Sequence, residues 1–441
     1  MSNMHQSSRR DFLKNSSTAV AGLALAGALQ IGRSAHAAGG DELKIALIGC
    51  GGRGTGAVLN CLSSVPNVKL WAMADAFADN LQTSLNNLKK EKIEQNWDHQ
   101  AIEGLGTRID VTPERCFVGF DAYQKALATN PDVVFLCTPP GFRPIHYAAA
   151  VAAGKHVFME KPCCIDAPGF RSFMESNKAA DEKNLKVVAG LQRHYQASYI
   201  EGIKKIHNGE IGDLVLLRAY WNGGEPWFRN RLPQMTEMEY QMRNNYHFVW
   251  LCGDHIVEQH VHNIDVCNWA KNDHPVEANG MGSCVRRYNC RDPKNGMGQI
   301  YDNHFVEFTY KDGSKMYSQC RQMPDTWGSV SEAVHGTKGV SNCQSGGQNA
   351  RNPYEQEHIA LFDAIRKNEK HNDGWHAATS SFTGVLGRMA TYSGQIVKWD
   401  EAAAQGPDEM PKRFAIDADP RAMPDKDGCY AIAMPGIYKP Y

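Results

Sequence analysis

Four ionisable side chains recur at helical spacing in the segment GDHIVEQHVHNID. They are His255, Glu258, His262 and Asp265. Separations of three, four and three residues place all four on one face of a single helix, which we predict over residues 255–270. An imidazole can take a proton from a substrate hydroxyl, and a neighbouring carboxylate can orient that imidazole. The spacing therefore predicts an acid–base site on this helix.

Two other interpretations of this helix stay open. Histidine and glutamate side chains also bind Zn²⁺, but the pattern is not H-E-x-x-H and no pair of cysteine ligands accompanies it. We therefore predict no bound metal. The other interpretation is a polar helix face whose hydrogen bonds are satisfied within the fold.

A second group that could do chemistry is the pair Glu160-Lys161, in the run HVFMEKP that forms a predicted strand over residues 156–162. A lysine ammonium at the end of a strand can hold and polarise the oxygen of an alcohol beside a nicotinamide ring. Lys161 is therefore a candidate catalytic residue. The alternative is a solvated charge pair at a strand end.

These groups need an element that brings a cofactor to them, and the stretch LKIALIGCGGRGTG supplies one. A short apolar run leads directly into Gly49, Gly51 and Gly54, which match G-x-G-x-x-G. In that motif the glycines allow a tight turn, the approach of backbone to a pyrophosphate, and close packing of a helix on a strand. We predict that Gly52 and Arg53 also contact the dinucleotide, because the amide groups that begin the helix face the phosphates. An ordinary glycine-rich loop is the alternative.

An acidic residue at the end of the next strand supports the same interpretation. The run from Val68 to Ala74 ends at Asp75, 21 residues after Gly54. A carboxylate at this place accepts hydrogen bonds from the adenosine ribose. It also disfavours a ribose phosphate, and no arginine follows it closely, so the predicted cofactor is NAD rather than NADP.

The buried strand DVVFLC stops at Thr138 and Pro139. In doubly wound folds ligands bind at the carboxyl edge of the parallel sheet, so these two residues join Glu160 and Lys161 in the predicted cofactor site. Strands and helices alternate throughout this region, which predicts a Rossmann domain over residues 41–185.

A second domain is predicted over residues 186–404, followed by a proline-rich tail over residues 405–441 that wraps a surface. The strand-like runs of this second domain cover residues 213–220, 277–288, 303–310 and 314–321. They indicate a mostly antiparallel sheet. The predicted fold class is therefore α/β, with an N-terminal doubly wound parallel sheet and a second α/β domain after it.

Aromatic and polar residues of the second domain are candidates for binding substrate. They are Arg193, Tyr195, Trp227 and His247, with His194, Trp221 and Tyr246 beside them, and His255 and Asp265 on the helix. Aromatic faces can pack against the C–H groups of a carbohydrate while polar groups bind its hydroxyls. Core packing is the alternative explanation for any single tryptophan.

Composition excludes some partners. A formal net charge of −1 gives no electrostatic basis for binding nucleic acid or an anionic membrane surface. The 13 cysteines include no metal-type C-x-x-C pair, and their odd number leaves at least one thiol unpaired in a monomer.

Residues 1–38 have the pattern of an export signal. Arg9 and Arg10 precede a mildly apolar run and the small-residue site AHA, a combination typical of the twin-arginine pathway. The apolar run is too short and too rich in alanine and glycine for stable insertion in a membrane. We expect a periplasmic or otherwise extracytoplasmic protein that is exported after folding around its cofactor. A disordered basic tail is the alternative.

The chain resembles the glucose-fructose oxidoreductase / inositol dehydrogenase / MocA (Gfo/Idh/MocA) family. The resemblance rests on the glycine loop, Asp75, the TPP of residues 138–140, the EKP of residues 160–162 and the His262-x-x-Asp265 helix, in this order. It covers essentially the whole chain after the signal. It implies a Rossmann domain followed by an α/β domain with an open, largely antiparallel sheet. That sheet often forms contacts between subunits, so we expect a homo-oligomer, a dimer or tetramer.

The resemblance also implies roles for individual residues. Lys161 and His262 match the catalytic lysine and histidine of the family. His262 would remove the proton of a sugar hydroxyl while hydride leaves the same carbon for the nicotinamide, and Lys161 would hold that oxygen. Many dehydrogenases of the family carry aspartate four residues before the histidine, whereas this chain has Glu258. Glu258 would orient His262 or hold a second hydroxyl.

Three functions follow as expectations. The first is an exported NAD-dependent oxidoreductase acting on a sugar, glycoside or polyol hydroxyl, with a nucleotide that can stay bound. The second is an NAD-dependent glycosidase that transiently oxidises a ring hydroxyl, eliminates the aglycone and reduces the ring again. The third is a non-catalytic sugar-binding protein on the same fold.

Overall fold

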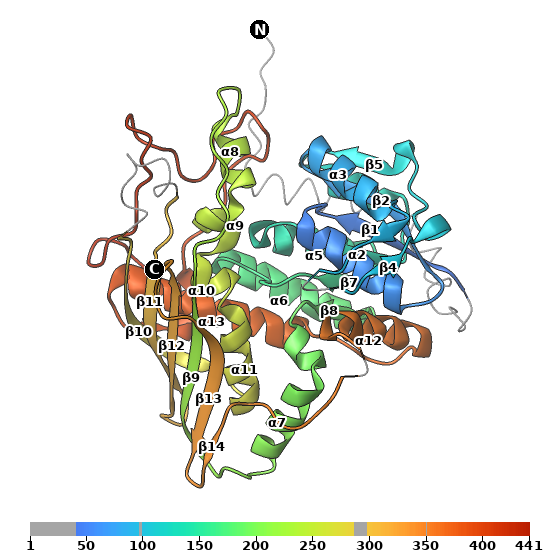
Figure 1. Cartoon of the computed structure of the whole chain (residues 1–441). Helices are drawn as coiled ribbons and strands as arrows, with labels where there is room; N and C mark the ends of the chain where they lie inside the picture. The colour runs from blue at the N-terminus through green and yellow to red at the C-terminus, as the bar shows by residue number, and fades with distance from the viewer. Residues whose placement is uncertain (1–40, 97–98, 286–297, 350) are drawn as a thin grey trace.

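The computed structural model describes residues 41–96, 99–285, 298–349 and 351–441, which form two large sheets and a two-stranded one, with helices around them (Figure 1). The predicted twin-arginine signal at residues 1–38 lies outside the described residues, so it stays a prediction.

The N-terminal half contains a six-stranded parallel sheet in the order β5-β2-β1-β6-β7-β8. Its strands are β1 (Leu43–Ile48), β2 (Val68–Asp75), β5 (Cys116–Val118), β6 (Val133–Leu136), β7 (His156–Met159) and β8 (Val187–Ala189). Because all the strands are parallel, their carboxyl ends lie at one edge of the sheet. The glycine turn follows β1 at this edge, Thr138 follows β6, and Glu160 follows β7. The predicted Rossmann-like sheet is confirmed.

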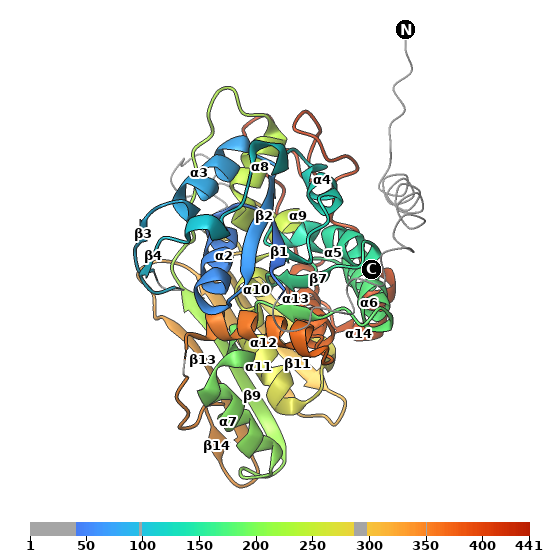
Figure 2. The same ribbon diagram turned by 90° about the vertical axis from the view of Figure 1, so that its right-hand side faces the viewer.

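Helices cover both faces of this sheet (Figure 2). They are α2 (Gly52–Ser64), α3 (Ala78–Leu88), α4 (Ala122–Ala128), α5 (Arg143–Ala152), α6 (Ala167–Glu182) and α12 (Pro353–Lys367). Although α12 comes from late in the chain, it packs against α2, and its Leu361 shares a buried cluster with Ile45 of β1. A small antiparallel hairpin, β3 (Lys92–Ile93) and β4 (Ile102–Glu103), lies beside the sheet.

The C-terminal half contains a seven-stranded sheet in the order β14-β13-β9-β12-β11-β10-β15. Its strands are β9 (Leu214–Gly223), β10 (Pro275–Ser283), β11 (Asn303–Tyr310), β12 (Lys315–Gln322), β13 (Ser329–Gly336), β14 (Val340–Ser341) and β15 (Val397–Lys398). Neighbouring strands are antiparallel except β9 and β12. The mostly antiparallel sheet is confirmed, and β13, β14 and β15 are strands that the sequence patterns did not indicate.

Helices pack on one face of this second sheet and leave the other face open (Figure 1). The C-terminal half contains α7 (Ala197–His207), α8 (Glu237–Arg243), α9 (Val249–Cys252), α10 (His255–Glu258), α11 (Val261–Lys271), α13 (Gly374–Ser393) and α14 (Trp399–Gln405). On β11, Val306 and Phe308 are fully buried toward the helices, whereas Phe305 is 40% exposed. This alternation shows a sheet with one covered face and one exposed face.

The helix predicted over residues 255–270 is two helices rather than one. Gly253 (φ 75°) and Asp254 (φ 77°) form a sharp left-handed turn before α10, which makes a single helical turn, and α11 begins only at Val261. His255 and Glu258 therefore lie on α10, whereas the other two predicted site residues lie on α11. Spacing alone assumes an unbroken helix, and the break removes the single shared face.

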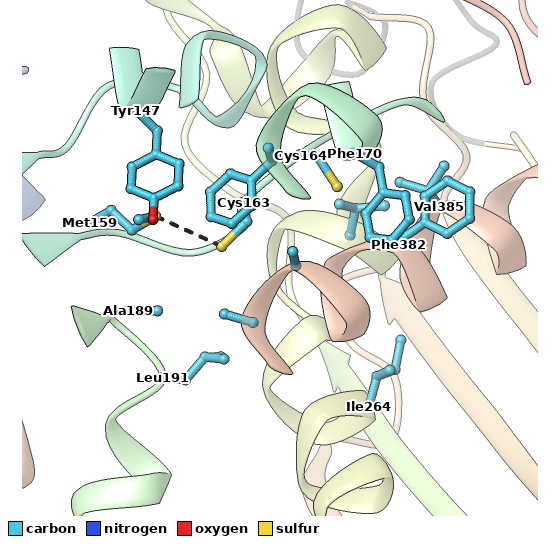
Figure 3. Close-up of a cluster of buried hydrophobic side chains, with 14 of the residues drawn as sticks. Tyr147, Met159, Cys163, Cys164, Phe170, Ala189, Leu191, Ile264, Phe382 and Val385 are labelled. Atoms are coloured by element: carbon cyan, nitrogen blue, oxygen red, sulfur yellow. Dashed lines mark hydrogen bonds between the residues drawn. The ribbon is translucent and has the colours of Figure 1, made fainter. Parts of the chain in front are cut away.

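The predicted start of a second domain at residue 186 falls inside the parallel sheet, because β8 pairs with β7. The two halves also share a buried core. In Figure 3, Met159 and Ala189 from the parallel sheet belong to the same cluster as Ile264 of α11 and Phe382 of α13. The halves are therefore packed against each other rather than joined by a flexible linker.

The tail after α14 wraps its own chain. The ring of Phe414 packs against Phe120 and Phe142, with ring centroids 6.3 and 5.5 Å apart. The amide of Gln241 on α8 donates a hydrogen bond of 2.5 Å to the carbonyl of Ala422. The tail thereby fixes α8 over the carboxyl edge of the parallel sheet.

Two further properties concern the described part of the chain. None of its helices has the length and apolar composition needed to cross a bilayer. Eleven of its cysteines are free thiols, among them the buried neighbours Cys163 and Cys164, and Cys429 is disulfide-bonded.

Candidate active site

A cavity of about 1290 Å³ lies at the carboxyl edge of the parallel sheet. Loops of that sheet form one side of it, and residues of β9, α8, α10 and α11 form the other. The predicted site residues that line it are Gly49, Gly51, Gly52, Arg53, Gly54, Asp75, Thr138, Pro139, Glu160, Lys161, Arg193, Trp227, Glu258 and His262. The fold therefore brings the predicted cofactor residues and the predicted catalytic residues into one space.

The turn after β1 has the geometry that a dinucleotide requires. Gly49 has φ 98°, and a Cβ there would lie 2.6 Å from the backbone of Cys137. A Cβ on Gly54 would lie 2.0 Å from the carbonyl oxygen of Gly49, because α2 packs directly on the turn. By contrast, a Cβ on Gly51 or Gly52 would meet nothing within 4 Å. The N-terminus of α2 is therefore open to a pyrophosphate.

Asp75 ends β2 beside this turn. One carboxylate oxygen accepts a hydrogen bond of 2.7 Å from the backbone N–H of Cys50, and the other accepts one of 2.9 Å from Phe77. Burial raises the pKa of Asp75, and these two hydrogen bonds oppose that rise. Asn80 also donates to Oδ1 at 3.4 Å, whereas Oδ2 can accept a further hydrogen bond, so the carboxylate has room for a ribose hydroxyl.

The side chain of Lys161 lines the cavity and contacts α10 through its ammonium group. It donates to the main-chain carbonyl of Glu258 at 2.5 Å and to the Oε1 atom of the same residue at 3.2 Å. The two side chains are only 13% and 7% exposed. Burial raises the pKa of Glu258, and the positive charge of Lys161 opposes that rise. One charged contact therefore joins the parallel sheet to the helix.

His262 lines the same cavity from α11. Its ring stacks on Trp221 of β9, with centroids 5.8 Å apart. Burial lowers the pKa of His262 well below its ordinary value, and the charges of Lys161 and Arg193 lower it further. A neutral imidazole can accept a proton, which is the requirement for a general base.

Glu160 faces the glycine turn. Its Oε1 atom lies 2.7 Å from Nε of Arg53, and the Arg53 guanidinium lies 5.2 Å from the ring centre of Tyr354 on α12. This ion pair ties the end of β7 to the N-terminus of α2. Tyr354 also lines the cavity, although no sequence motif marks it.

Four residues predicted to bind substrate do not line the cavity. They are Tyr195, His247, His255 and Asp265, and their hydrogen-bond partners are, in that order, Asp373, the carbonyl of Trp227, Asp254 and His194. Each of these side chains makes a hydrogen bond within the fold. The geometry therefore indicates structural contacts for them, and gives no support to substrate binding.

Arg193 does line the cavity, but its guanidinium is held by Glu332 of β13. Glu332 also accepts hydrogen bonds from Tyr199 and Asn263. Burial raises the pKa of Glu332, and Arg193 opposes that rise. Glu332 was not predicted, because the strand that carries it was not predicted.

A roof of residues from α8 and the loop after it closes the side of the cavity near Asp75. The guanidinium of Arg243 lies 4.2 Å from the ring centre of Phe77 and 2.9 Å from a carboxylate oxygen of Asp79. Arg243 and Tyr246 both line the cavity. Tyr246 was a candidate for binding substrate, whereas Arg243 follows no recognisable motif and could not be placed at the cavity from the sequence.

The described residues contain two groups with three side chains close enough to hold a metal. They are Asp254 with His255 and His304, and His194 with Asp265 and His376. Neither group contains Glu258 or His262. The alternative of a metal held by His255, Glu258 and His262 therefore lacks a geometric basis, because the helix break separates these side chains.

Comparisons with known sequences agree with this geometry. Residues 43–191 match the family model GFO_IDH_MocA, an oxidoreductase family with an NAD-binding Rossmann fold. The inositol 2-dehydrogenase of Klebsiella pneumoniae (strain 342) is 25% identical over 178 residues, 40% of this chain and 45% of that enzyme. The inositol 2-dehydrogenase/D-chiro-inositol 3-dehydrogenase of Lactiplantibacillus plantarum is 30% identical over 152 residues, 33% and 36% of the two chains. The matched region spans less than half the length of these curated relatives.

Solved structures extend the likeness in fold to most of the chain. The scyllo-inositol dehydrogenase from Lactobacillus casei with bound NAD(H) and scyllo-inositol has a TM-score of 0.59 and 18% identity, with 81% of this chain and 99% of that chain covered. The aldose-aldose oxidoreductase from Caulobacter crescentus complexed with glycerol has a TM-score of 0.57 and 15% identity, with 81% and 100% covered. At these identities the likeness concerns the fold alone.

Geometry and comparisons agree on the cofactor. The glycine turn leaves space where a pyrophosphate would lie, and the carboxylate of Asp75 can accept a hydrogen bond from a ribose hydroxyl. The family model that covers the same residues is that of an NAD-binding domain. Residues 43–191 therefore form an NAD-binding Rossmann domain that matches the model of the Gfo/Idh/MocA oxidoreductase family.

Proposed function

We propose that this protein is an NAD-dependent oxidoreductase that transfers hydride between the hydroxyl-bearing carbon of a sugar, glycoside or polyol and the nicotinamide. The observation that carries the proposal is the contact of Lys161 with Glu258, with His262 lining the same cavity as the glycine turn. The names of the similar proteins, inositol dehydrogenases and an aldose-aldose oxidoreductase, support a polyhydroxylated substrate.

The residues of the chain have separable roles in this reaction. Bound NAD supplies the hydride acceptor. Lys161 holds the oxygen of the reacting hydroxyl and stabilises the negative charge that develops there. The neutral imidazole of His262 accepts the hydroxyl proton as the C–H bond gives up its hydride, so a carbonyl group forms. Glu258 fixes the ammonium of Lys161.

The roof over the nucleotide favours a second candidate. Because residues of α8 cover the side of the cavity near Asp75, and the tail holds α8 through the hydrogen bond of Gln241 to Ala422, a nucleotide bound there would be slow to exchange. A retained nucleotide suits a redox-neutral glycosidase. There a ring hydroxyl would be oxidised to a ketone, the carbon beside the ketone would lose a proton, and the next carbon would lose the aglycone. Water would add to the resulting double bond, and the nicotinamide reduced in the first step would reduce the ketone again. The arrangement of Lys161 and His262 disfavours the third possibility, a non-catalytic sugar-binding protein.

We also propose that the protein acts outside the cytoplasm and as a homo-oligomer. The twin-arginine pattern at Arg9 and Arg10 supports export, and the disulfide bond of Cys429 suits an oxidising compartment. The open face of the seven-stranded sheet, with Phe305 exposed on it, supports a contact between subunits.

The test is to purify the protein without added nucleotide and follow the absorbance of reduced nicotinamide while sugars, polyols and aryl glycosides are added. A lasting rise would identify a dehydrogenase and its substrate class. Aglycone release without a lasting rise, and lost when NAD is stripped, would identify the glycosidase. If NAD binds but no compound causes either change, the proposed function is wrong.

A further inference from the structure

Asp254 is a fully buried carboxylate that the proposed chemistry does not use. It lies in the turn between α9 and α10, and its side chain is 0% exposed. Its φ of 77° falls in the left-handed region, which is unfavourable for any residue except glycine. Glycine would relieve that strain, so the aspartate side chain must contribute something that offsets it.

The carboxylate of Asp254 is the centre of a buried hydrogen-bond network. Its Oδ1 atom accepts hydrogen bonds from the backbone and from Nδ1 of His255, the latter at 2.8 Å, and it lies 3.2 Å from Nε2 of His304. Its Oδ2 atom accepts from the backbone of Tyr301 at 3.0 Å and from the hydroxyl of Tyr392 at 2.5 Å. Burial alone would raise the pKa of Asp254, but the two histidines lower it well below its ordinary value. The network therefore holds a charged carboxylate.

The residues around this carboxylate come from separate elements of the fold. His304 lies on β11 and Tyr392 lies on α13, the long helix that packs on the second sheet. His255 is the first residue of α10. The carboxylate of Asp254 therefore fixes the start of α10 to both the sheet and its covering helix.

The other end of α10 carries the catalytic contact. The main-chain carbonyl of Asp254 accepts hydrogen bonds of 2.9 Å from the N–H groups of Val257 and Glu258. Glu258 in turn accepts two hydrogen bonds from the ammonium of Lys161. A single helical turn thus connects the buried carboxylate to the cavity.

We propose that Asp254 is a positioning residue, which acts by anchoring α10 so that Glu258 holds the ammonium of Lys161 at the reacting oxygen. Its effect on turnover rests on the proposed function, whereas its effect on the environment of Lys161 does not. A metal held by Asp254, His255 and His304 is the competing explanation. The hydrogen bonds favour a network without metal, because the backbone N–H groups of His255 and Tyr301 and the hydroxyl of Tyr392 already donate to the carboxylate of Asp254.

The test compares Asp254→Asn with Asp166→Asn in the full-length protein. Asp166 is a matched control, because it is also a buried aspartate before a helix and accepts hydrogen bonds from Gly169 at 2.7 Å and Glu409 at 2.9 Å, but its helix α6 has no residue that lines the cavity. We expect Asp254→Asn to lower kcat by about 10²-fold with little change in KM, because a small displacement of a catalytic group has effects of that size. Asp166→Asn should lower thermal stability and leave kcat nearly unchanged.

A second readout needs no substrate. Acetic anhydride acetylates the neutral amine form of a lysine side chain, with acetate as the leaving group, and peptide mass spectrometry measures the extent of labelling at Lys161. We expect faster labelling of Lys161 in Asp254→Asn than in Asp166→Asn, because Glu258 no longer holds the ammonium. If Asp254→Asn fails to fold, Tyr392→Phe removes one donor to the same carboxylate and should change labelling and kcat in the same direction by a smaller factor.

Two results would overturn the inference. One is a folded Asp254→Asn protein whose Lys161 labelling and kcat match those of the wild type. The other is one equivalent of metal in the purified wild type that is lost in Asp254→Asn, which would assign the cluster to a metal. If the wild type oxidises no sugar, the proposed function fails by itself, and the labelling of Lys161 still decides the role of Asp254.

Discussion

The ammonium of Lys161 donates hydrogen bonds to both the main-chain carbonyl and the carboxylate of Glu258, a residue 97 positions away in the chain. Lys161 follows the end of a parallel strand, and Glu258 ends a one-turn helix in the other half of the fold. The contact therefore fixes the distance between the cofactor side and the substrate side of the cavity. A change that moves α10 should therefore also displace the ammonium of Lys161 from the reacting oxygen.

Replacement of Lys161 by methionine should abolish turnover and leave NAD bound. Methionine keeps the apolar length of the side chain but removes the ammonium that holds the hydroxyl oxygen. Turnover with the best sugar and NAD affinity measured by calorimetry would check this prediction. Lys125→Met is the control, because Lys125 lies on the surface of α4 and pairs with Asp121. Turnover at the wild-type rate in Lys161→Met would remove this residue from the mechanism.

Replacement of His262 by alanine should slow hydride transfer by roughly 10²–10⁴-fold, the usual contribution of a general base. Because the pKa of His262 is lowered well below its ordinary value, the imidazole stays neutral as the pH falls below about 6.5. Wild-type kcat/KM should therefore stay constant from neutral pH to below that value. Single-turnover rates over a pH series would test both points. An acid limb that begins above pH 6.5, or one that persists in His262→Ala, would show that another group is the base.

The cofactor half of the site could be predicted because its determinants are local. A glycine turn directly follows a strand, and Asp75, Thr138 and Lys161 each follow a strand of the same parallel sheet. Parallel strands end at one edge, so the chain order of these residues is enough to bring them together. His262 could be placed because it matches a family motif, and that motif implies its position in the site.

The substrate half could not be predicted as well, because long-range contacts decide it. The helical spacing grouped His255 with Glu258, but the left-handed turn at Gly253 and Asp254 turns α10 so that His255 contacts Asp254 instead. Tyr195 follows β8, which belongs to the parallel sheet. Its hydroxyl donates a hydrogen bond to the carboxylate of Asp373, a residue from late in the chain. No local pattern reports contacts of this kind.

Replacement of Arg243 by glutamine should speed the release of NAD by roughly three- to tenfold. Across to the nucleotide side the guanidinium pairs with Asp79 and contacts the ring of Phe77, while a second ion pair joins it to Glu239 within α8. Each interaction of this kind at a partly exposed position is worth up to about 1 kcal/mol. Stopped-flow displacement of NADH would measure the rate. Arg413→Gln, which removes an exposed ion pair with Asp417, is the control. Equal release rates in the wild type and both variants would show that the roof does not limit exchange.

Two glycine substitutions should separate folding from cofactor binding. Gly54→Ala places a Cβ 2.0 Å from the carbonyl oxygen of Gly49, so it should destabilise the fold by about 1–3 kcal/mol as well as weaken NAD binding. Gly51→Ala places a Cβ in open space where a pyrophosphate would lie, so it should weaken NAD binding and leave the melting temperature of the nucleotide-free protein unchanged. Calorimetry and thermal denaturation would measure both. Unchanged NAD affinity in Gly51→Ala would mean that the pyrophosphate binds elsewhere.

Acid should destabilise the fold through histidines that are buried without charge. Burial lowers the pKa of His146 to about 3 and that of His156 to about 4, and nearby positive charges contribute in both cases. The Nδ1 atom of His156 accepts a hydrogen bond of 2.9 Å from the backbone of Lys186, which protonation would break. The unfolded chain therefore binds protons below about pH 6.5 that the folded chain does not bind.

The free energy of unfolding should accordingly fall as the pH decreases from about 6.5 to 4, with a slope of up to about 1.4 kcal/mol per pH unit for each of these histidines. His194 acts in the opposite sense, because Asp265 raises its pKa against the effect of burial, and its contribution is lost as the pH rises through that value. Urea denaturation at a series of pH values would measure the slope. His156→Gln keeps an acceptor near the Lys186 N–H but cannot titrate. The slope of its unfolding free energy against pH should therefore be lower than that of the wild type by the contribution of one histidine. An unchanged slope would mean that His156 gains its proton in the folded state as readily as in the unfolded chain.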